Sequence, residues 1–305
     1  MPKIIFTTSS FDLKNCAGLD QVQAAGYEVV VNPLGRRLKE DEAAAFLADG
    51  VVGMVAGVEP LTASVLNAAA SLKVISRCGI GLDSVDLDAA KQRGIAVFNT
   101  PGAPTLAVAE LTLAHLLSML RRVAESDRGI RRGEWKPLMG SLLAKQTVGL
   151  IGYGRIGRKV GELVRAFGAK VVVHDPISAP AESVSLEDLA AAADVVSLHV
   201  PYMADNHHLI DAGFLGRMKQ GALLLNISRG GLVDEQALLE ALNSGHLGGA
   251  ALDCFETEPY NGPLSGHDRV QCTAHMGSYA QEARALMEAE AWDNLVLGLK
   301  NAQLL

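Results

Sequence analysis

The sequence has 305 residues, of which 49% are hydrophobic and 20% are charged, with a formal net charge of -7. This length is sufficient for two domains of about 150 residues each, and the composition is that of an ordinary globular α/β protein. The negative charge argues against a nucleic-acid partner, which requires a clustered basic surface. No apolar run reaches the roughly 18 residues that a membrane helix needs, and the amino-terminal stretch is not apolar enough for a signal peptide.

Two further features of the composition exclude other classes of site. The four cysteines, at positions 16, 78, 254 and 272, are too far apart to form a metal or redox motif. We therefore expect no metal ligands, no disulfide framework and a reducing, cytoplasmic location. The basic residues between 121 and 136 are interrupted by acidic ones, which fits a solvated helix face or a subunit contact better than a polyanion site.

Strands and helices alternate along the first part of the chain. Apolar runs predict strands at 3–7, 27–31, 51–55, 73–77 and 95–98, and helical patterns occupy a short segment before the second strand, 41–48, 60–70 and 86–93. This alternation predicts a doubly wound parallel sheet. The proline- and glycine-rich segment 100–104 interrupts the pattern, and we place the first domain crossing there. A long apolar helix at 105–122 and a connection at 129–146 follow, with Trp135 expected to be an anchor.

A second alternating region begins at Thr147. Strands are predicted at 147–151, 170–175, 194–199, 222–227, 248–252 and 269–273, helices at 186–192, 211–217 and 234–244, and a loop at 176–180. Residues 279–300 form one long helical pattern, which makes the first domain discontinuous if it crosses back. The fold class is therefore α/β, with two Rossmann-like doubly wound parallel-sheet domains. We assign 1–98 with 277–305 to one domain and 99–276 to the other.

The segment from Gln146 to Asp175 carries a dinucleotide-binding pattern. An apolar strand leads into Gly152-Tyr153-Gly154-Arg155-Ile156-Gly157, and a helix and a second strand follow. The first glycine allows a tight turn, the second lets the backbone approach a pyrophosphate, and the third lets the helix pack on the strand. The phosphates would then meet the free N–H groups of the helix N-terminus. Asp175 ends the second strand, where a carboxylate binds the ribose 2′-OH and repels a 2′-phosphate, so NAD is favoured over NADP.

Polar residues follow three later strands at the same predicted edge of the sheet. They are Arg229, the acidic pair Asp253 and Glu258, and His275. Reduction of a 2-oxo acid needs these residue types, because a guanidinium binds the carboxylate and a protonated imidazole, oriented by a carboxylate, donates to the carbonyl oxygen. Each residue also has a structural interpretation: Asp253 and His275 as helix caps, and Glu258 as a solvated loop acid. The joint occurrence favours a catalytic site.

Nearly the whole chain resembles the D-2-hydroxyacid dehydrogenase family, and most of all its phosphoglycerate dehydrogenase branch. The resemblance rests on the glycine loop, Ala107-Val108-Ala109-Glu110-Leu111 and His199-Val200-Pro201, and on four further motifs: residues 77–86, 226–235, 251–253 with 258–259, and 275–277. It implies that Arg229, Glu258 and His275 are catalytic, with Glu258 as the partner of His275, and that Asp253 contacts the nicotinamide amide.

The same resemblance implies the remaining site residues. Residues at the cofactor would be Gly152, Gly154, Arg155, Ile156, Gly157, Asp175, Val200, Pro201, Ile227, Ser228, Arg229, Asp253, His275 and Gly277. The substrate would bind Arg229 and His275, with its carboxylate on the backbone of Cys78 and Gly79. The family also implies a cleft between two domains, a discontinuous substrate domain and a homodimer formed through the cofactor domains.

Several positions depart from the family pattern. Ser84 and Asn206 stand where asparagine and threonine are usual. The chain ends after the long helix, so we expect no C-terminal regulatory domain and no feedback by serine through one. Formate dehydrogenases have glutamine at the position of Glu258, which argues against that activity here.

The expected function is NAD-dependent reduction of a small 2-oxo acid such as hydroxypyruvate or glyoxylate. The loop at 56–62 contains Glu59 and no cation, whereas a phosphorylated substrate needs a second cationic pocket. The first alternative is a D-3-phosphoglycerate dehydrogenase of serine biosynthesis. The alternative of another class is an NADH-sensing protein similar to transcriptional co-repressors, although the long disordered tails of those proteins are not expected here.

Overall fold

The computed structural model describes residues 1–178 and 183–305. It divides into two compact units, Met1–Pro104 with Ser278–Leu305 and Thr105–Gly277. The first boundary between the units therefore falls after Pro104, whereas the sequence analysis placed it after residue 98. The difference arises because residues 99–104 belong to the first unit. Residues 179 and 180 of the loop expected at 176–180 lie outside the described residues.

The first unit is built on a five-stranded parallel sheet with the order β2-β1-β3-β4-β5. Its strands are β1 Lys3–Phe6, β2 Glu28–Val31, β3 Val51–Ala56, β4 Val74–Arg77 and β5 Ala96–Asn99. Its helices are α1 Leu19–Ala24, α2 Glu40–Leu47, α3 Ala63–Ala68, α4 Leu87–Gln92 and the carboxyl-terminal α11 Gln281–Asn301. The strand order reverses between β1 and β3, so the crevice typical of doubly wound sheets is expected at their carboxyl ends.

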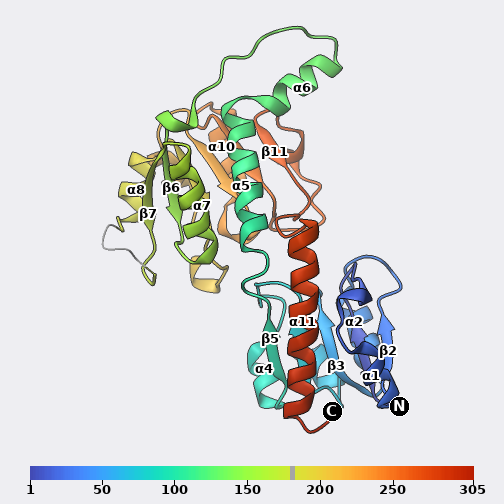
Figure 1. The fold of residues 1–305 in the computed structure, drawn as a ribbon. Coiled ribbons are helices and arrows are strands. Elements are labelled where there is room, and N and C mark those ends of the chain that lie inside the picture. The colour runs from blue at the N-terminus through green and yellow to red at the C-terminus, as the bar shows by residue number, and fades with distance from the viewer. Residues whose placement is uncertain (179–182) are drawn as a thin grey trace. The chain divides into compact units, whose positions relative to one another are not determined.

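Helix α11 returns to the first unit and packs closely on its sheet (Figure 1). Two glycines make this approach possible: a Cβ atom at Gly53 would lie 2.8 Å from Leu295 Cδ1, and one at Gly298 would lie 2.6 Å from Val74 Cγ1. Trp292 on the same helix is fully buried and donates a hydrogen bond of 2.8 Å to the Ala17 carbonyl.

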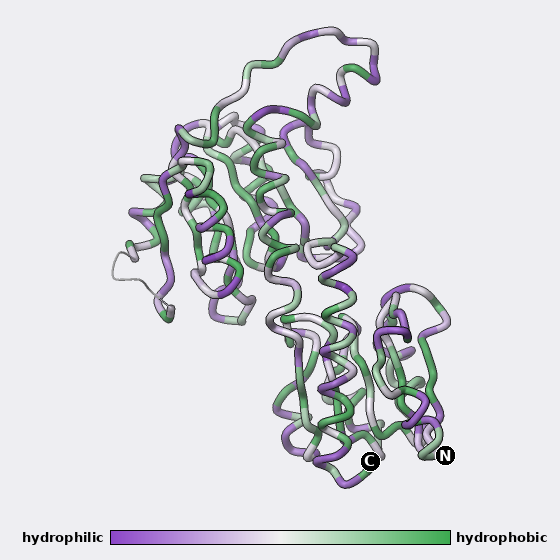
Figure 2. The backbone as a smooth tube through the Cα atoms, in the orientation of Figure 1, coloured by the Kyte–Doolittle hydropathy of each residue, from purple (hydrophilic) through white to green (hydrophobic). Residues whose placement is uncertain are grey.

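The second unit contains a six-stranded parallel sheet with the order β11-β10-β9-β8-β6-β7. Its strands are β6 Thr147–Ile151, β7 Lys170–His174, β8 Val195–Leu198, β9 Leu223–Asn226, β10 Gly249–Leu252 and β11 Val270–Cys272. The α-helices are α5 Thr105–Leu120, α6 Val123–Arg131, α7 Arg155–Ala166, α8 Leu186–Ala192, α9 Ala212–Arg217 and α10 Glu235–Asn243. The strands are mainly hydrophobic (Figure 2), and β8 and β10 are buried throughout, as strands covered on both faces require.

The segment after α5 differs from the expectation. α5 ends at Leu120, Arg122 adopts a left-handed conformation with φ 53°, and a separate helix, α6, begins at Val123. α6 carries an ion pair of 2.7 Å between Arg131 and Asp127, so its charges form a solvated helix face. Trp135 is 89% exposed, so the prediction that it anchors this connection to its own chain was wrong. α6 and the connection after it extend away from the sheet (Figure 1).

Over the described ranges, 1–178 and 183–305, no helix is both long enough and apolar enough to cross a membrane.

Candidate active site

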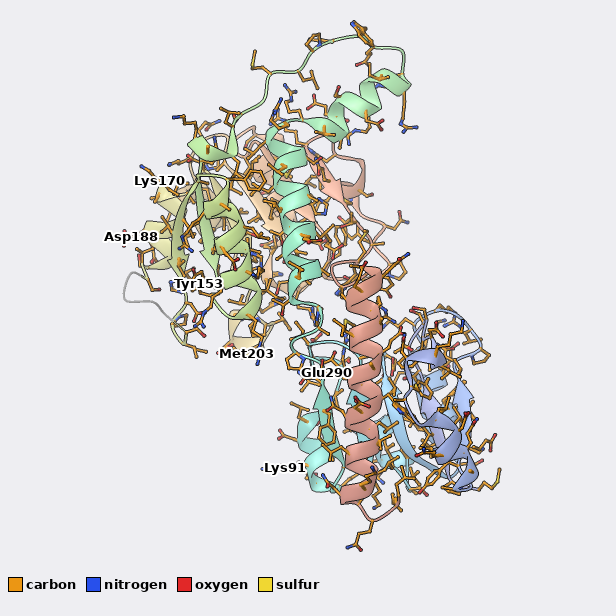
Figure 3. The ribbon with its side chains drawn as sticks, viewed as in Figure 1. Lys91, Tyr153, Lys170, Asp188, Met203 and Glu290 are labelled. Atoms are coloured by element: carbon orange, nitrogen blue, oxygen red, sulfur yellow. The ribbon has the colours of Figure 1, made fainter. Side chains whose placement is uncertain are left out.

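The strand order of the second sheet places its topological switch point between β6 and β8. The chain leaves β6 toward β7 on one side, and the later strands add on the side of β8. Doubly wound sheets bind ligands outside the carboxyl ends of the strands at such a point. Figure 3 shows Tyr153 and Met203, which follow β6 and β8, at one end of this sheet, and Lys170, which begins β7, at the other.

The three glycines after β6 have different environments. Gly152 has φ 94°, and a Cβ atom there would lie 2.6 Å from the His199 carbonyl oxygen. A Cβ atom at Gly157 would lie 2.1 Å from the Gly152 carbonyl oxygen, so only glycine allows this approach of α7. A Cβ atom at Gly154 would meet nothing within 4 Å. The space beside Gly154, at the N-terminus of α7, therefore fits the phosphate-binding loop of a dinucleotide site.

Asp175 follows β7 and is directed toward the glycine loop. Its Oδ2 accepts a hydrogen bond of 2.6 Å from the Tyr153 N–H, and its Oδ1 accepts bonds from the N–H groups of Ile177 and Ser178. Burial opposes ionisation of this carboxyl, but the bonds from Ser178, Tyr153 and Ile177 outweigh it and lower the pKa of Asp175. The charged carboxylate thus lies beside the loop that would hold the dinucleotide.

The loops after β8 and β9 are joined at the same edge of the sheet. The Ser228 hydroxyl donates a hydrogen bond to the Val200 carbonyl. Asn226, which is buried, accepts from the Ser228 N–H at 3.1 Å and donates to the Arg229 carbonyl at 2.8 Å. Asn226 therefore fixes the backbone turn that carries Ile227, Ser228 and Arg229.

His275 and Glu258 form a direct pair. His275 Nδ1 lies 3.0 Å from Glu258 Oε1 and 2.9 Å from Oε2, and the imidazole is partly exposed. The Phe255 N–H donates to Glu258 Oε1 at 3.1 Å, which fixes the carboxylate. A histidine with its Nδ1 on a carboxylate is oriented and can hold a proton at Nε2, as a general acid requires.

Asp253 holds the turn on which His275 lies. Its carboxylate accepts hydrogen bonds of 2.8 Å from the N–H groups of Met276 and Gly277 and one of 2.6 Å from the Thr273 hydroxyl. The His275 N–H donates to the Asp253 carbonyl at 2.7 Å. These bonds maintain His275 at φ 50°, a left-handed conformation that costs about 1–3 kcal/mol and persists only under such restraint.

Three charged residues of the predicted site affect the pKa of one buried thiol, that of Cys254. Burial raises the pKa of Cys254 well above its usual value, Arg229 lowers it, and Asp253 and Glu258 raise it further. Arg229, Asp253 and Glu258 thus all lie within electrostatic range of Cys254. The geometry brings together the glycine loop, Asp175, the turn with Arg229, and the His275–Glu258 pair along the carboxyl edge of one sheet.

The predicted substrate residues Cys78 and Gly79 lie in the first unit, directly after β4. The Cys78 N–H donates to the Ala56 carbonyl at 2.9 Å and the Gly79 N–H to the Arg77 carbonyl at 3.0 Å. Both donors expected to bind a carboxylate are therefore engaged within the chain. Gly79 has φ 144°, and a Cβ atom there would overlap the Arg77 guanidinium, so this loop requires glycine.

Glu59 lies at the carboxyl edge of the first sheet, after β3. It is 1% exposed and accepts hydrogen bonds from the Thr7 hydroxyl and from the Gly57 N–H at 3.1 Å. The carboxylate is therefore directed toward its own loop, which the sequence alone did not indicate. The loop nevertheless contributes no cation to this edge.

Comparison with known proteins identifies the family. Residues 113–277 match the model of the D-isomer specific 2-hydroxyacid dehydrogenase, NAD binding domain, and lie within the second unit. The chain is 38% identical over 257 residues to a hydroxypyruvate reductase of Thermotoga maritima, covering 81% of this chain and 84% of that protein. The chain belongs to the D-isomer specific 2-hydroxyacid dehydrogenase family. It is thus an NAD-dependent oxidoreductase that acts on CH–OH groups, as the sequence predicted.

Two further members of the family are similar over most of this chain. A D-3-phosphoglycerate dehydrogenase of Mycobacterium leprae is 40% identical over 256 residues, which are 81% of this chain and 48% of that protein. The chain thus spans about half the length of such relatives. The crystal structure of a glyoxylate reductase from Paecilomyes thermophila has 28% identity and a TM-score of 0.88, covering 100% of this chain and 97% of that one. These likenesses confirm the predicted fold of two parallel-sheet α/β domains.

The sequence analysis missed two groups of residues. Asn226 and Thr273 support the site only through hydrogen bonds that the fold creates. His207, His208 and Glu256 form a cluster beside the site that no motif indicates, because Glu256 is remote in sequence from the two histidines.

Proposed function

We propose that this protein reduces a small, unphosphorylated 2-oxo acid, such as hydroxypyruvate or glyoxylate, with NADH. The observation that carries the proposal is the pair formed by His275 Nδ1 and Glu258 Oε2, 2.9 Å apart. Within a family of 2-hydroxyacid dehydrogenases, an imidazole held in this way is the natural acid for a carbonyl oxygen that becomes a hydroxyl.

Each catalytic residue has a distinct role in this proposal. His275 donates the proton from Nε2 to the substrate oxygen, and Glu258 orients the ring and stabilises its charged form. Arg229 binds the substrate carboxylate and polarises the carbonyl through its guanidinium. Arg229 Nη1 donates to the Ser228 carbonyl at 2.8 Å, and the Cys78 and Gly79 N–H groups are also engaged within the chain. The Arg229 guanidinium has further donors for the substrate carboxylate, with the backbone of the loop at Cys78 and Gly79 as a second contact.

We place the cofactor at the carboxyl edge of the second sheet. Bound NADH supplies the hydride. The pyrophosphate would lie on the glycine loop at Gly154, Arg155 and Ile156, since a Cβ atom at Gly154 meets no neighbour, and Asp175 would bind the ribose. The residues proposed to flank the rest of the cofactor are Val200, Pro201, Ile227, Ser228, Asp253 and Gly277.

The proposed substrate class follows from charge. A desolvated phosphate needs cationic or N–H-rich partners, and the loop 56–62 contains no cation. The second candidate is D-3-phosphoglycerate dehydrogenase activity, which the 40% identity to the enzyme of Mycobacterium leprae favours.

Steady-state kinetics distinguish the two candidates. We expect NADH-dependent reduction of hydroxypyruvate or glyoxylate with a kcat/KM at least equal to that for phosphohydroxypyruvate. A kcat/KM for phosphohydroxypyruvate more than about ten times that for hydroxypyruvate, equivalent to about 1.4 kcal/mol at the transition state, would favour the second candidate.

An NADH-sensing, co-repressor-like role remains the alternative from another class. Such a protein would bind NADH and oxidise none of it with any 2-oxo acid. Loss of NADH absorbance with the substrate panel therefore excludes a role limited to NADH binding.

We further propose a homodimer formed through the cofactor unit. α6 and the connection after it expose five large apolar side chains, and exposed apolar surface of this kind typically marks an interface. They are Val123, Ile130, Trp135, Met139 and Leu142. Double substitution of Trp135 and Met139 by serine should convert the dimer to a monomer in sedimentation equilibrium.

The proposal also assigns a role to each unit and a cellular location to the protein. The unit Thr105–Gly277 would bind the cofactor and the unit that contains α11 would bind the substrate. All four cysteines are free, which fits a reducing cytoplasm.

A further inference from the structure

Three side chains in the second unit form a cluster that the proposed reaction does not use. His207, His208 and Glu256 offer ligand atoms within 4.8 Å of one another. The histidines follow β8 and its connecting turn, whereas Glu256 follows β10 and lies two residues before Glu258. In the part of the chain that the structure describes, this is the one group of three or more such side chains with this spacing.

The backbone at the two histidines has an unusual form. His207 has φ -58° and ψ 129°, His208 has φ 53°, and the Leu209 N–H donates to the Asn206 carbonyl at 3.1 Å. This is a type II turn, in which the position of His208 favours glycine. A histidine there costs about 1–3 kcal/mol, and such outliers gather at functional sites.

The turn also explains why two adjacent side chains lie together. Neighbouring side chains of an extended backbone point to opposite sides. The left-handed His208 instead turns its ring back onto that of His207, with centroids 3.8 Å apart and an angle of 26° between the rings. Two imidazoles and the Glu256 carboxylate thereby bring their ligand atoms within 4.8 Å of one another.

Neighbouring groups orient the cluster and give it negative charge. The Tyr202 hydroxyl lies 3.2 Å from His207 Nδ1, which orients that ring. His208 Nε2 contacts Glu256 Oε1. The Glu256 N–H donates to Glu235 Oε1 at 2.9 Å, so a second carboxylate lies close by. The two carboxylates attract a divalent cation.

We propose that His207, His208 and Glu256 bind one divalent transition-metal ion of the zinc class. Imidazole nitrogen and carboxylate oxygen are ligands that zinc prefers, whereas magnesium and calcium take oxygen ligands alone. Three protein ligands leave a position for water. The sequence analysis expected no metal ligands because the cysteines are too far apart for a metal motif. Two adjacent histidines and a distant glutamate form no recognisable metal motif either.

Titration of the full chain with Zn²⁺, followed by calorimetry, tests the site. We expect one Zn²⁺ per chain and no comparable binding of Mg²⁺. The decisive variant is His208→Gly, since glycine suits the left-handed position and should preserve folding while it removes a ligand. The Kd of this variant for Zn²⁺ should rise by well over ~10-fold. Loss of a residue that only hydrogen-bonds a metal ligand already weakens metal affinity by about that factor, and this variant loses a ligand itself.

Two further variants and a control complete the experiment. Glu256→Gln and His207→Asn should each weaken Zn²⁺ binding similarly, whereas His267→Asn, which removes a histidine outside the cluster, should bind as the unaltered chain does. Absence of binding by the unaltered chain overturns the proposal. So does undiminished binding by His208→Gly, because the ion would then lie elsewhere.

Discussion

The Tyr153 N–H donates a hydrogen bond of 2.6 Å to Asp175 Oδ2, which ties the residue that follows β7 to the glycine loop that follows β6. The carboxylate therefore has two roles: it fixes the loop, and it places a negative charge where the ribose of a dinucleotide is expected. Its pKa is lowered because hydrogen bonds from three N–H groups outweigh burial. It is therefore charged at neutral pH.

The first prediction concerns cofactor preference. NADH should support a much higher kcat/KM than NADPH, because the Asp175 charge repels a 2′-phosphate. Asp175→Asn should narrow this ratio by at least about tenfold, the equivalent of 1.4 kcal/mol, while it keeps an acceptor for Tyr153. Asp194→Asn is the matched control, since Asp194 is paired with Lys219 and precedes β8. Equal use of both cofactors by the unaltered chain would contradict the assignment.

The second prediction concerns proton transfer. Reduction requires protonated His275, so the rate should fall as pH rises. Glu258→Gln removes the charge that stabilises the imidazolium, so the basic limb of the pH profile for reduction should move to lower pH. His275→Ala should reduce kcat at least ~100-fold, as expected for a lost general acid. A basic limb that stays in place in Glu258→Gln would show that Glu258 acts otherwise.

The third prediction compares two glycines of one loop. Gly157→Ala would place a Cβ atom 2.1 Å from the Gly152 carbonyl oxygen, whereas Gly154→Ala meets nothing within 4 Å. The first change should lower the free energy of unfolding by about 1–3 kcal/mol, as overpacking does. The second should alter it by less than about 0.5 kcal/mol, yet raise the KM for NADH. Thermal unfolding and steady-state kinetics measure the two effects, and a normal KM in Gly154→Ala would refute the proposed phosphate contact.

The fourth prediction concerns acid stability. Burial lowers the pKa of His199 from 6.5 to about 4. Between these values the unfolded chain binds a proton that the folded chain does not, so stability is lost as pH falls from 6.5 toward 4. His199→Asn should remove up to about 1.4 kcal/mol per pH unit from this slope. Urea unfolding at several pH values tests it, with the range above pH 7, where the slopes of both proteins should agree, as the internal control.

The sequence predicted most of the fold because apolar runs indicate buried strands and glycines indicate turns. It predicted the glycine loop and the His275–Glu258 pair from motifs, and in the structure that pair is in hydrogen-bond contact. It could not predict α6, whose charged residues pair with one another and whose apolar residues are exposed. The pattern of a core-packed helix is therefore absent there.

The sequence also could not predict which polar side chains are buried or in which direction they point. The sequence shows Glu59 in a loop without a cation, but it does not show that the fold buries the Glu59 carboxylate against Thr7 and Gly57. The cluster of His207, His208 and Glu256 depends on a left-handed residue and on the adjacency of two loops, neither of which a sequence pattern specifies.

The last prediction concerns substrate charge. It tests whether a cation added to the loop after β3 improves the use of a phosphorylated substrate. Val58 lies in the loop after β3 and is 38% exposed, so a longer side chain can be accommodated there. Val58→Arg should raise the ratio of kcat/KM for phosphohydroxypyruvate over hydroxypyruvate by about tenfold, since a charge-assisted contact to phosphate contributes on the order of 1.4 kcal/mol. Val58→Gln, of similar length and without charge, should leave the ratio unchanged. An unchanged ratio in Val58→Arg would mean that this loop does not face the substrate's distal group, and that substrate charge is selected elsewhere in the chain.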